Sequence, residues 1–189
     1  MVADLPTAPD VPAARGEGPA DLATVWRTLA AIPDPEIPVV SIVDLGMVRS
    51  VERDGDGVVV RVTPTYSGCP ATDWILAAIR DELSAIGVPD VRIEIRLAPA
   101  WTTDWIAPDA RLRLREFGIA PPGCEIAAGA VAAVDVRGIS PLRRADVVVP
   151  CPRCGSARTR LTAQFGSTAC KALYRCDECL EPFDYFKPH

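Results

Sequence analysis

Four of the seven cysteines stand in two Cys-x-x-Cys pairs near the C-terminal end of the sequence. The pairs are Cys151 with Cys154 and Cys176 with Cys179, and 21 residues separate them. Each pair can form a tight turn that directs two thiolates at one ion, and two such turns complete a tetrahedral shell. Zinc, mononuclear iron and iron–sulfur clusters all accept four thiolates, but the paired spacing favours zinc. A shell with no open position predicts a structural metal rather than a catalytic one.

Cys69 has the most informative surroundings of the three remaining cysteines. It follows Ser67 and Gly68 and precedes Pro70, where a strand-like run gives way to a helical pattern. Because Pro is favoured at the first position of a helix, we predict that Cys69 is the N-cap residue, at a helix end that stabilises a thiolate. Asp73, one turn later, opposes that effect. Taken alone, the pattern fits a capping or core cysteine slightly better than a functional thiol.

The other two cysteines carry weaker signals. Cys170 precedes Lys171, whose charge could favour a reactive thiolate, but a small buried side chain is the better interpretation. Cys124 has no motif around it, and we expect it to be inert.

The single histidine, His189, excludes several kinds of catalytic machinery. A di-iron site built on Glu-x-x-His pairs is impossible, and Ser-His-Asp or Cys-His catalysis is disfavoured because the imidazole stands on the last residue. The sequence has neither a dinucleotide-binding nor a P-loop motif. Seven cysteines without a secretory signal or a long apolar run predict a protein of the reducing cytoplasm with no membrane span.

The charge of the chain is unevenly distributed. Residues 150–189 carry six Lys/Arg and four Asp/Glu, a net charge of +2, whereas the whole chain carries −5. Broad nucleic-acid binding requires a basic surface, so the overall acidity counts against it. A nucleic-acid-binding zinc ribbon therefore remains an alternative that only the basic C-terminal segment favours.

The elements that must position these thiols follow from hydrophobic periodicity and turn residues. Apolar residues at helical spacing predict helices over 21–32 and 71–86, and a third helix is predicted over 108–117, closed by Gly118. β-rich runs predict a hairpin over 47–63, and strict alternation predicts a strand over 91–97. Three further strands, 161–165, 171–175 and 182–186, would complete a zinc ribbon. The expected fold is therefore α+β: a helix–hairpin–helix–strand–helix domain followed by a β-type zinc ribbon.

Composition divides the chain into four parts. We expect a disordered lead-in at 1–19, the α+β domain at 20–119, a connector at 120–149 and the ribbon at 150–189. One strand is predicted within the connector, near 131–136.

Three motifs of the α+β domain together resemble a known family. They are Asp34-Pro35-Glu36-Ile37-Pro38, the run from Ile42 to Val48, and Ser-Gly-Cys-Pro at 67–70. These motifs resemble the domain shared by bacterial SufT and the eukaryotic targeting factors of cytosolic iron–sulfur protein assembly. With residues 99–106 and the ribbon sequence 181–187, the chain resembles the PaaD family, accessory subunits encoded with phenylacetyl-CoA epoxidase. The resemblance covers residues 22–189.

The resemblance implies a maturation role without catalysis of its own. The partner would be the iron–sulfur reductase component of the epoxidase complex, which functions in aerobic phenylacetate breakdown. Cys69 would be the functional thiol, with Asp34, Pro35 and Glu36 as a second signature. Because one thiolate cannot hold a cluster, iron or a cluster would bind transiently, across a homo-oligomer or together with the client. A thiol-dependent enzyme using Cys69 is the other alternative, although the sequence offers it no clear activating base.

Overall fold

The computed structural model describes residues 21–123 and 148–188. The chain divides into two compact units, and the division falls between Arg113 and Leu114, inside helix α3 (Pro108–Phe117). The predicted strand near 131–136, Cys124 and His189 lie outside the described residues.

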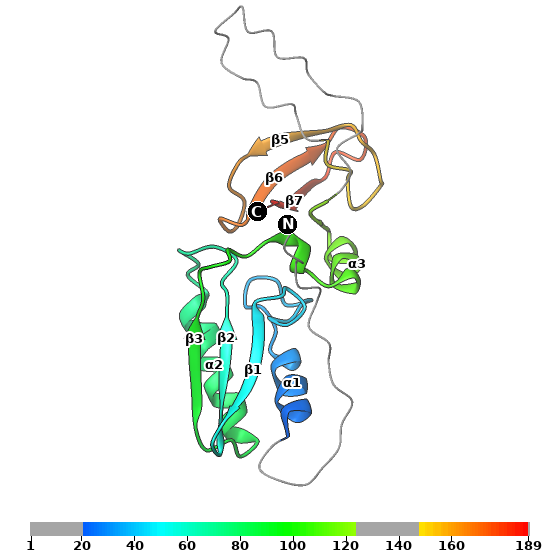
Figure 1. Ribbon diagram of the computed structural model, residues 1–189. Coiled ribbons are helices and arrows are strands. Elements are labelled where there is room, and N and C mark those ends of the chain that lie inside the picture. The colour runs from blue at the N-terminus through cyan, green and yellow to red at the C-terminus, as the bar shows by residue number, and fades with distance from the viewer. Residues whose placement is uncertain (1–20, 124–147, 189) are drawn as a thin grey trace, which may run out of the picture. The chain divides into compact units, whose positions relative to one another are not determined.

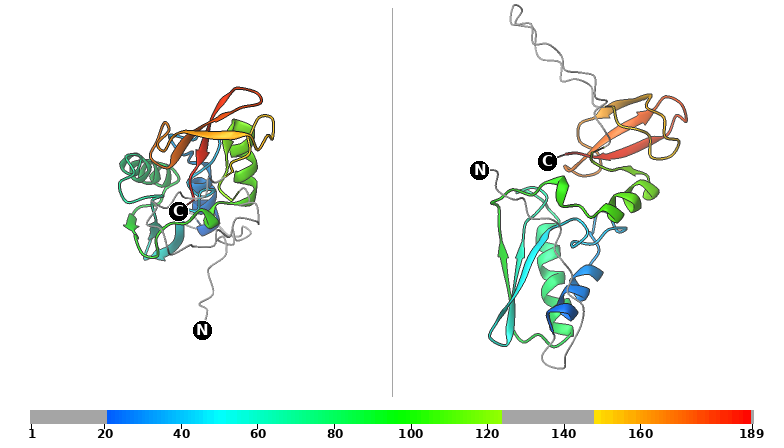
Figure 2. Two further views of the ribbon diagram at one scale, coloured as in Figure 1. Left: turned by 90° about the horizontal axis from the view of Figure 1, so that it is seen from above. Right: turned by 45° about the vertical axis from the view of Figure 1, so that its right-hand side comes forward.

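The first unit packs two helices on one face of a three-stranded sheet (Figures 1 and 2). Strands β1 (Val48–Asp54) and β2 (Gly57–Val62) form an antiparallel hairpin, and β3 (Val91–Ile95) pairs parallel to β2. The helices are α1 (Leu22–Ala31) and α2 (Thr72–Ala85). These elements confirm the predicted order of helix, hairpin, helix and strand.

The core of this unit lies between the helices and the sheet. Strand β2 is buried along nearly its whole length, and Val58, Val59, Val60 and Val62 are each at most 3% exposed. The helices contribute their apolar stripes, which comprise Val25, Trp26 and Leu29 from α1 and Ile75, Ile79 and Leu83 from α2. This periodicity explains why the sequence identified the helices correctly.

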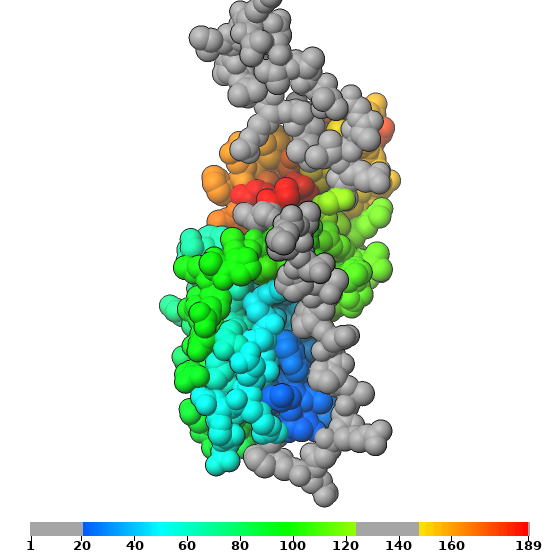
Figure 3. All heavy atoms as spheres, viewed as in Figure 1, coloured from blue at the N-terminus to red at the C-terminus, as the bar shows by residue number. Residues whose placement is uncertain are grey.

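The opposite face of the sheet is at the surface of the space-filling view (Figure 3). It carries a network of ion pairs in which Arg61 contacts both Glu52 and Glu94. Strand β3 was expected to run to residue 97 and to be half-buried. Val91 and Ile93 are half-buried as expected, but the strand ends at Ile95, and Ile95 and Leu97 are 47% and 59% exposed.

The second unit is a four-stranded sheet in the order β4-β7-β6-β5. Strands β5 (Thr159–Ala163), β6 (Lys171–Cys176) and β7 (Pro182–Phe186) are antiparallel neighbours, and β5 begins two residues earlier than predicted. The short strand β4 (Ile119–Ala120) pairs parallel to β7. It follows α3, and Gly118 between the two elements has φ +95°, a conformation suited to glycine.

Candidate functional site

Two similar turns carry the four paired cysteines. In the first, the Gly155 N–H donates to the Cys151 carbonyl at 2.9 Å, and Gly155 has φ +75°. In the second, the Glu178 N–H donates to the Cys176 Sγ at 3.4 Å, and Leu180 occupies the corresponding position with φ +63°. A backbone N–H group that points at sulfur stabilises a thiolate, so the second turn prepares Cys176 to bind a cation.

The structure brings the four predicted ligands together, with all four Sγ atoms within 4.8 Å of one another. Cys151 Sγ lies 3.7 Å from Cys179 Sγ, and Cys154 Sγ lies 3.6 Å from Cys176 Sγ. A tetrahedral ion with metal–sulfur bonds of about 2.3 Å requires edges of about 3.8 Å between sulfurs. The donor set and its spacing therefore fit a four-coordinate metal ion.

The pKa values of these thiols also point to a cation. Burial would raise the pKa of Cys176, but the N–H groups of Cys179 and Glu178, with the neighbouring thiols, lower it to about 7. The Glu181 N–H lowers the pKa of Cys179, but burial and the neighbouring thiols raise it to about 12. A thiolate at Cys176 thus disfavours ionisation of Cys179, and a cation at the centre would relieve this repulsion.

A small apolar core supports the metal centre. Cys151 and Cys176 are fully buried in a cluster that includes Tyr174, Phe183 and Tyr185. Tyr174 stacks on Phe183 and meets Tyr185 edge-on, with ring centroids 5.9 Å and 5.6 Å apart. Such a core is small, so metal binding contributes much of the folding free energy of the ribbon.

Cys69 lies in a turn before α2, and its predicted role as the N-cap is wrong. The helix begins at Thr72 with Ala71 as N-cap residue, and no side chain caps it. The Cys69 N–H donates to the Tyr66 carbonyl and the Cys69 carbonyl accepts from the Thr72 N–H, each at 3.2 Å. The sequence could not foresee this extra turn, because Pro70 is equally compatible with a turn and a first helical residue.

The surroundings of Cys69 raise its pKa above the ordinary value. Burial is the largest cause, and the carboxylates of Glu36 and Asp34 add to it, while hydrogen bonds from Ala71 and Thr72 oppose it. The structure therefore places the second signature segment close enough to act electrostatically on this half-buried thiol. Asp73 opposed thiolate formation in the sequence-based interpretation, but Glu36 and Asp34 are the acidic groups that act on Cys69 here.

Asp34 has a clear structural role in its loop. Its Oδ1 accepts hydrogen bonds from the N–H groups of Glu36 and Ile37, both at 2.9 Å, and its own N–H donates to the Val40 carbonyl. This arrangement makes Asp34 a turn-forming residue between two prolines.

A scaffold of contacts that the sequence alone did not predict holds the motifs of the first unit together. Trp101 Nε1 donates to the Leu45 carbonyl at 2.8 Å, and the Arg49 guanidinium lies 3.5 Å from the centroid of the Trp105 ring. Gly46 has φ +67° and approaches the Trp105 backbone so closely that no side chain would fit. The motifs at 42–48 and 99–106 are thus two halves of one packing contact.

Asp44 completes this scaffold. It exchanges hydrogen bonds with Ser41, and its Oδ1 lies 2.8 Å from Arg113 Nη2. Burial would raise the pKa of Asp44, but the hydrogen bonds from Arg113 and Ser41 outweigh it and lower the pKa. The two residues are 69 positions apart, so no local pattern in the sequence predicts this ion pair.

Cys170, expected to be a small buried side chain, is buried, with its Sγ 3.0 Å from the Thr168 Oγ1.

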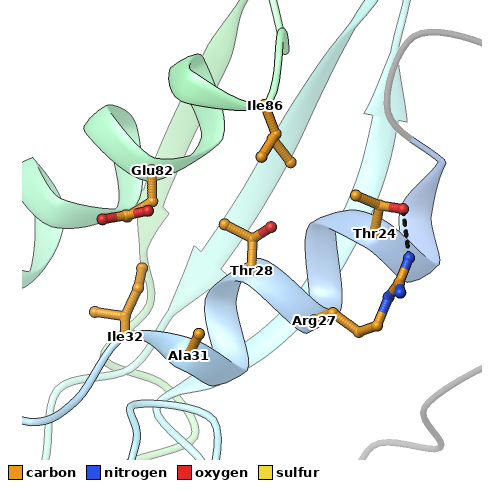
Figure 4. Close-up of a pocket in the computed structure, with 7 residues that line it drawn as sticks. All are labelled: Thr24, Arg27, Thr28, Ala31, Ile32, Glu82 and Ile86. Carbon is orange, nitrogen blue, oxygen red and sulfur yellow. Dashed lines mark hydrogen bonds between the residues drawn. The ribbon is translucent and has the colours of Figure 1, made fainter.

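A separate groove of about 580 Å³ lies between α1 and α2 (Figure 4). It is lined by Thr24, Arg27, Thr28, Ala31, Ile32, Glu82 and Ile86. Arg27 points toward Thr24 and donates a hydrogen bond to it at 2.8 Å, and none of the predicted site residues lines this groove.

Comparison with known protein families matches both units. Residues 22–95 match the family described as "Iron-sulfur cluster assembly protein", and residues 138–187 match the "PaaD zinc beta ribbon domain". The fold and the thiol sites thus define an iron–sulfur assembly domain joined to a metal-binding ribbon.

A full-length relative identifies the family. The chain is 52% identical to a subunit of the "Putative 1,2-phenylacetyl-CoA epoxidase" of Escherichia coli (strain K12), over 89% of this chain and 94% of the relative. The chain therefore belongs to the PaaD family.

Two shorter relatives match the first unit alone. The "Fe-S protein maturation auxiliary factor" of Porphyromonas gingivalis (strain ATCC BAA-308 / W83) is 38% identical over 48% of this chain and 87% of its own length. The "Fe-S protein maturation auxiliary factor YitW" of Bacillus subtilis (strain 168) is 34% identical over 48% of this chain and 89% of its own length. Within residues 21–123 and 148–188, no helix is both long and apolar enough to cross a membrane.

Proposed function

We propose that this protein is a non-catalytic maturation factor that assists iron–sulfur cluster assembly or insertion in the phenylacetyl-CoA epoxidase system. One observation carries the proposal: an iron–sulfur assembly domain and a PaaD ribbon occur in one chain that is 52% identical, over nearly all of its length, to a protein named as a subunit of this epoxidase. The client is the iron–sulfur reductase component, and both proteins reside in the cytoplasm. The ribbon metal is zinc, with a structural role.

The chemistry of Cys69 supports a role in binding a metal cargo. Its raised pKa keeps it a neutral thiol near neutral pH, which makes it a poor nucleophile and counts against a thiol-dependent enzyme. The same carboxylates of Asp34 and Glu36 that disfavour a free thiolate attract a cation. Iron or an iron–sulfur cluster can then displace the thiol proton to solvent and bind through sulfur.

The binding of this cargo is necessarily transient and shared. Among the described residues, the four ribbon cysteines are the only group of three or more potential ligands that converge. Cys69 therefore offers one thiolate, and a cluster needs further ligands from a second copy or from the client. A weakly held cargo is what transfer to a client requires.

The experiment that tests the proposal is co-production of the reductase component with and without this chain. Iron content and the visible absorption of the cluster would be measured on the purified reductase. We expect a higher cluster occupancy when the chain is present. Equal occupancy in its absence would refute the maturation role.

A further inference from the structure

The second unit contains a pocket that neither metal binding nor the Cys69 chemistry uses. It has a volume of about 280 Å³ and lies at the start of β4 and on strands β6 and β7 beside the first cysteine turn. We call it the ribbon pocket. It is lined by Phe117, Gly118, Ile119, Arg153, Lys171, Leu173, Pro182, Phe183 and Asp184.

Lys171 brings a buried positive charge to the ribbon pocket. Its side chain is only 5% exposed, and its ammonium lies 3.7 Å from Asp184 Oδ2. That carboxylate oxygen also accepts a hydrogen bond from the Ser167 hydroxyl at 3.2 Å. A distance of 3.7 Å is longer than a hydrogen bond, so the Lys171 ammonium retains donors for a second anionic partner.

Arg153 adds a second positive charge at the edge of the same pocket. Within residues 114–123 and 148–188, Arg158 pairs with Glu178 and Arg160 with Asp177. Arg153 has no ion pair or hydrogen bond in this part of the chain, and it stands in the first cysteine turn, between Cys151 and Cys154. With Lys171 and Asp184, the ribbon pocket holds two cations and one anion.

The remaining wall of the ribbon pocket is apolar. Phe117 is 52% exposed, and Leu173, Pro182 and the buried Phe183 line the pocket beside it. A volume near the lower limit of ligand pockets suits one or two side chains better than a whole small molecule. Nucleic acid would require a row of phosphate contacts, which two cations in an acidic chain do not supply.

We propose that the ribbon pocket is the docking site for an exposed acidic segment of the client protein. An Asp or Glu carboxylate of that segment bonds to Arg153 and Lys171, and an adjacent apolar side chain packs on Phe117 and Leu173. The identity of the client rests on the proposed function, whereas the recognition chemistry rests on the pocket alone. Docking on the ribbon would hold the client while Cys69 exchanges its cargo.

The first test uses the metal-loaded full chain labelled with ¹⁵N. The probes are an acetylated Phe-Asp-Leu amide and its Phe-Asn-Leu analogue. We expect the Asp peptide to shift the amide signals of Arg153, Lys171 and Leu173, and the Asn peptide to leave them in place. Equal shifts with both peptides, or shifts at other residues only, would overturn the proposal.

The second test measures binding of the purified reductase component to variants of the full chain. Loss of a charged hydrogen-bond partner predicts binding about 10–100-fold weaker for Arg153→Glu. Arg160→Glu, the same charge reversal on β5, is the matched control, and we expect less than about a threefold change, as is usual for a surface charge pair. The zinc content of both variants should equal that of wild type. Equal affinity for wild type and Arg153→Glu would overturn docking at this pocket.

The two proposals fail in distinguishable ways. If wild type does not raise the cluster occupancy of the reductase, the proposed function fails. If wild type raises occupancy and binds the reductase, but Arg153→Glu binds equally well, only the docking inference fails.

Discussion

Gly46→Ala tests the packing contact between the motifs at 42–48 and 99–106 of the first unit. A Cβ at residue 46 would lie 2.5 Å from the Trp105 carbonyl oxygen and 2.6 Å from the Trp105 Cβ. Neither atom belongs to a flexible side-chain end, so the backbone must move. The positive φ of +67° costs about 1–2 kcal/mol for alanine, and the overlap adds roughly 1–3 kcal/mol.

The expected loss is therefore about 3 kcal/mol of unfolding free energy. For a domain of this size it corresponds to a fall in melting temperature on the order of 15 °C. All four tryptophans lie in the first unit, so tryptophan fluorescence during heating reports on this unit and not on the ribbon.

Gly55→Ala is the matched control for Gly46→Ala. Gly55 also has a positive φ, +60°, but an added Cβ would meet nothing within 4 Å. Gly55→Ala should lose only the unfolding free energy that the positive φ costs, about 1–2 kcal/mol. Equal destabilisation of the two variants would show that Gly46 does not touch Trp105 as the structure has it.

Three further predictions concern the metal, the scaffold ion pair and the thiol. Cys176→Ser should release the ribbon metal and open the remaining ribbon thiols to alkylation, with tryptophan fluorescence unchanged; a variant that keeps a stoichiometric metal ion would contradict this. Asp44 has a lowered pKa, so its stabilisation is complete above its ordinary value of 3.8 and is lost as the pH falls through the folded-state pKa. Asp44→Asn should therefore lower the melting temperature at neutral pH, and this difference from wild type should disappear in acid. A melting-temperature difference that does not change with pH would refute the ion-pair argument. Glu36→Gln removes a carboxylate that raises the pKa of Cys69, so peptide-resolved mass spectrometry should show faster alkylation of Cys69 at mildly alkaline pH, and unchanged or slower alkylation would contradict the proximity.

Local signals in the sequence predicted the elements of this protein well. Helix α3 has the predicted bounds because Pro108 and Gly118 mark its two ends. The four ribbon cysteines were found because two spaced pairs constrain the chain by themselves. The start of helix α2 was predicted one residue too early, because a proline suits both a turn and a helix start.

Contacts between distant segments were beyond the reach of the sequence. The pairing of Asp44 with Arg113 and the approach of Gly46 to Trp105 join residues with no common motif. Strand β4 was missed because two residues carry no periodicity, and only pairing with β7 defines it. The proximity of Glu36 to Cys69 likewise depends on how the loop of Asp34 folds back.

Growth on phenylacetate with a Cys69→Ser chain tests the central claim most directly. Serine keeps the size of the side chain, but its hydroxyl stays protonated near neutral pH and cannot bind iron as a thiolate does. Cys124→Ser is the matched control, which should be silent in both growth and melting temperature.

If Cys69 carries the cargo, Cys69→Ser should leave the melting temperature of the first unit near that of wild type while growth on phenylacetate collapses. Normal growth of the Cys69→Ser cells would contradict the account.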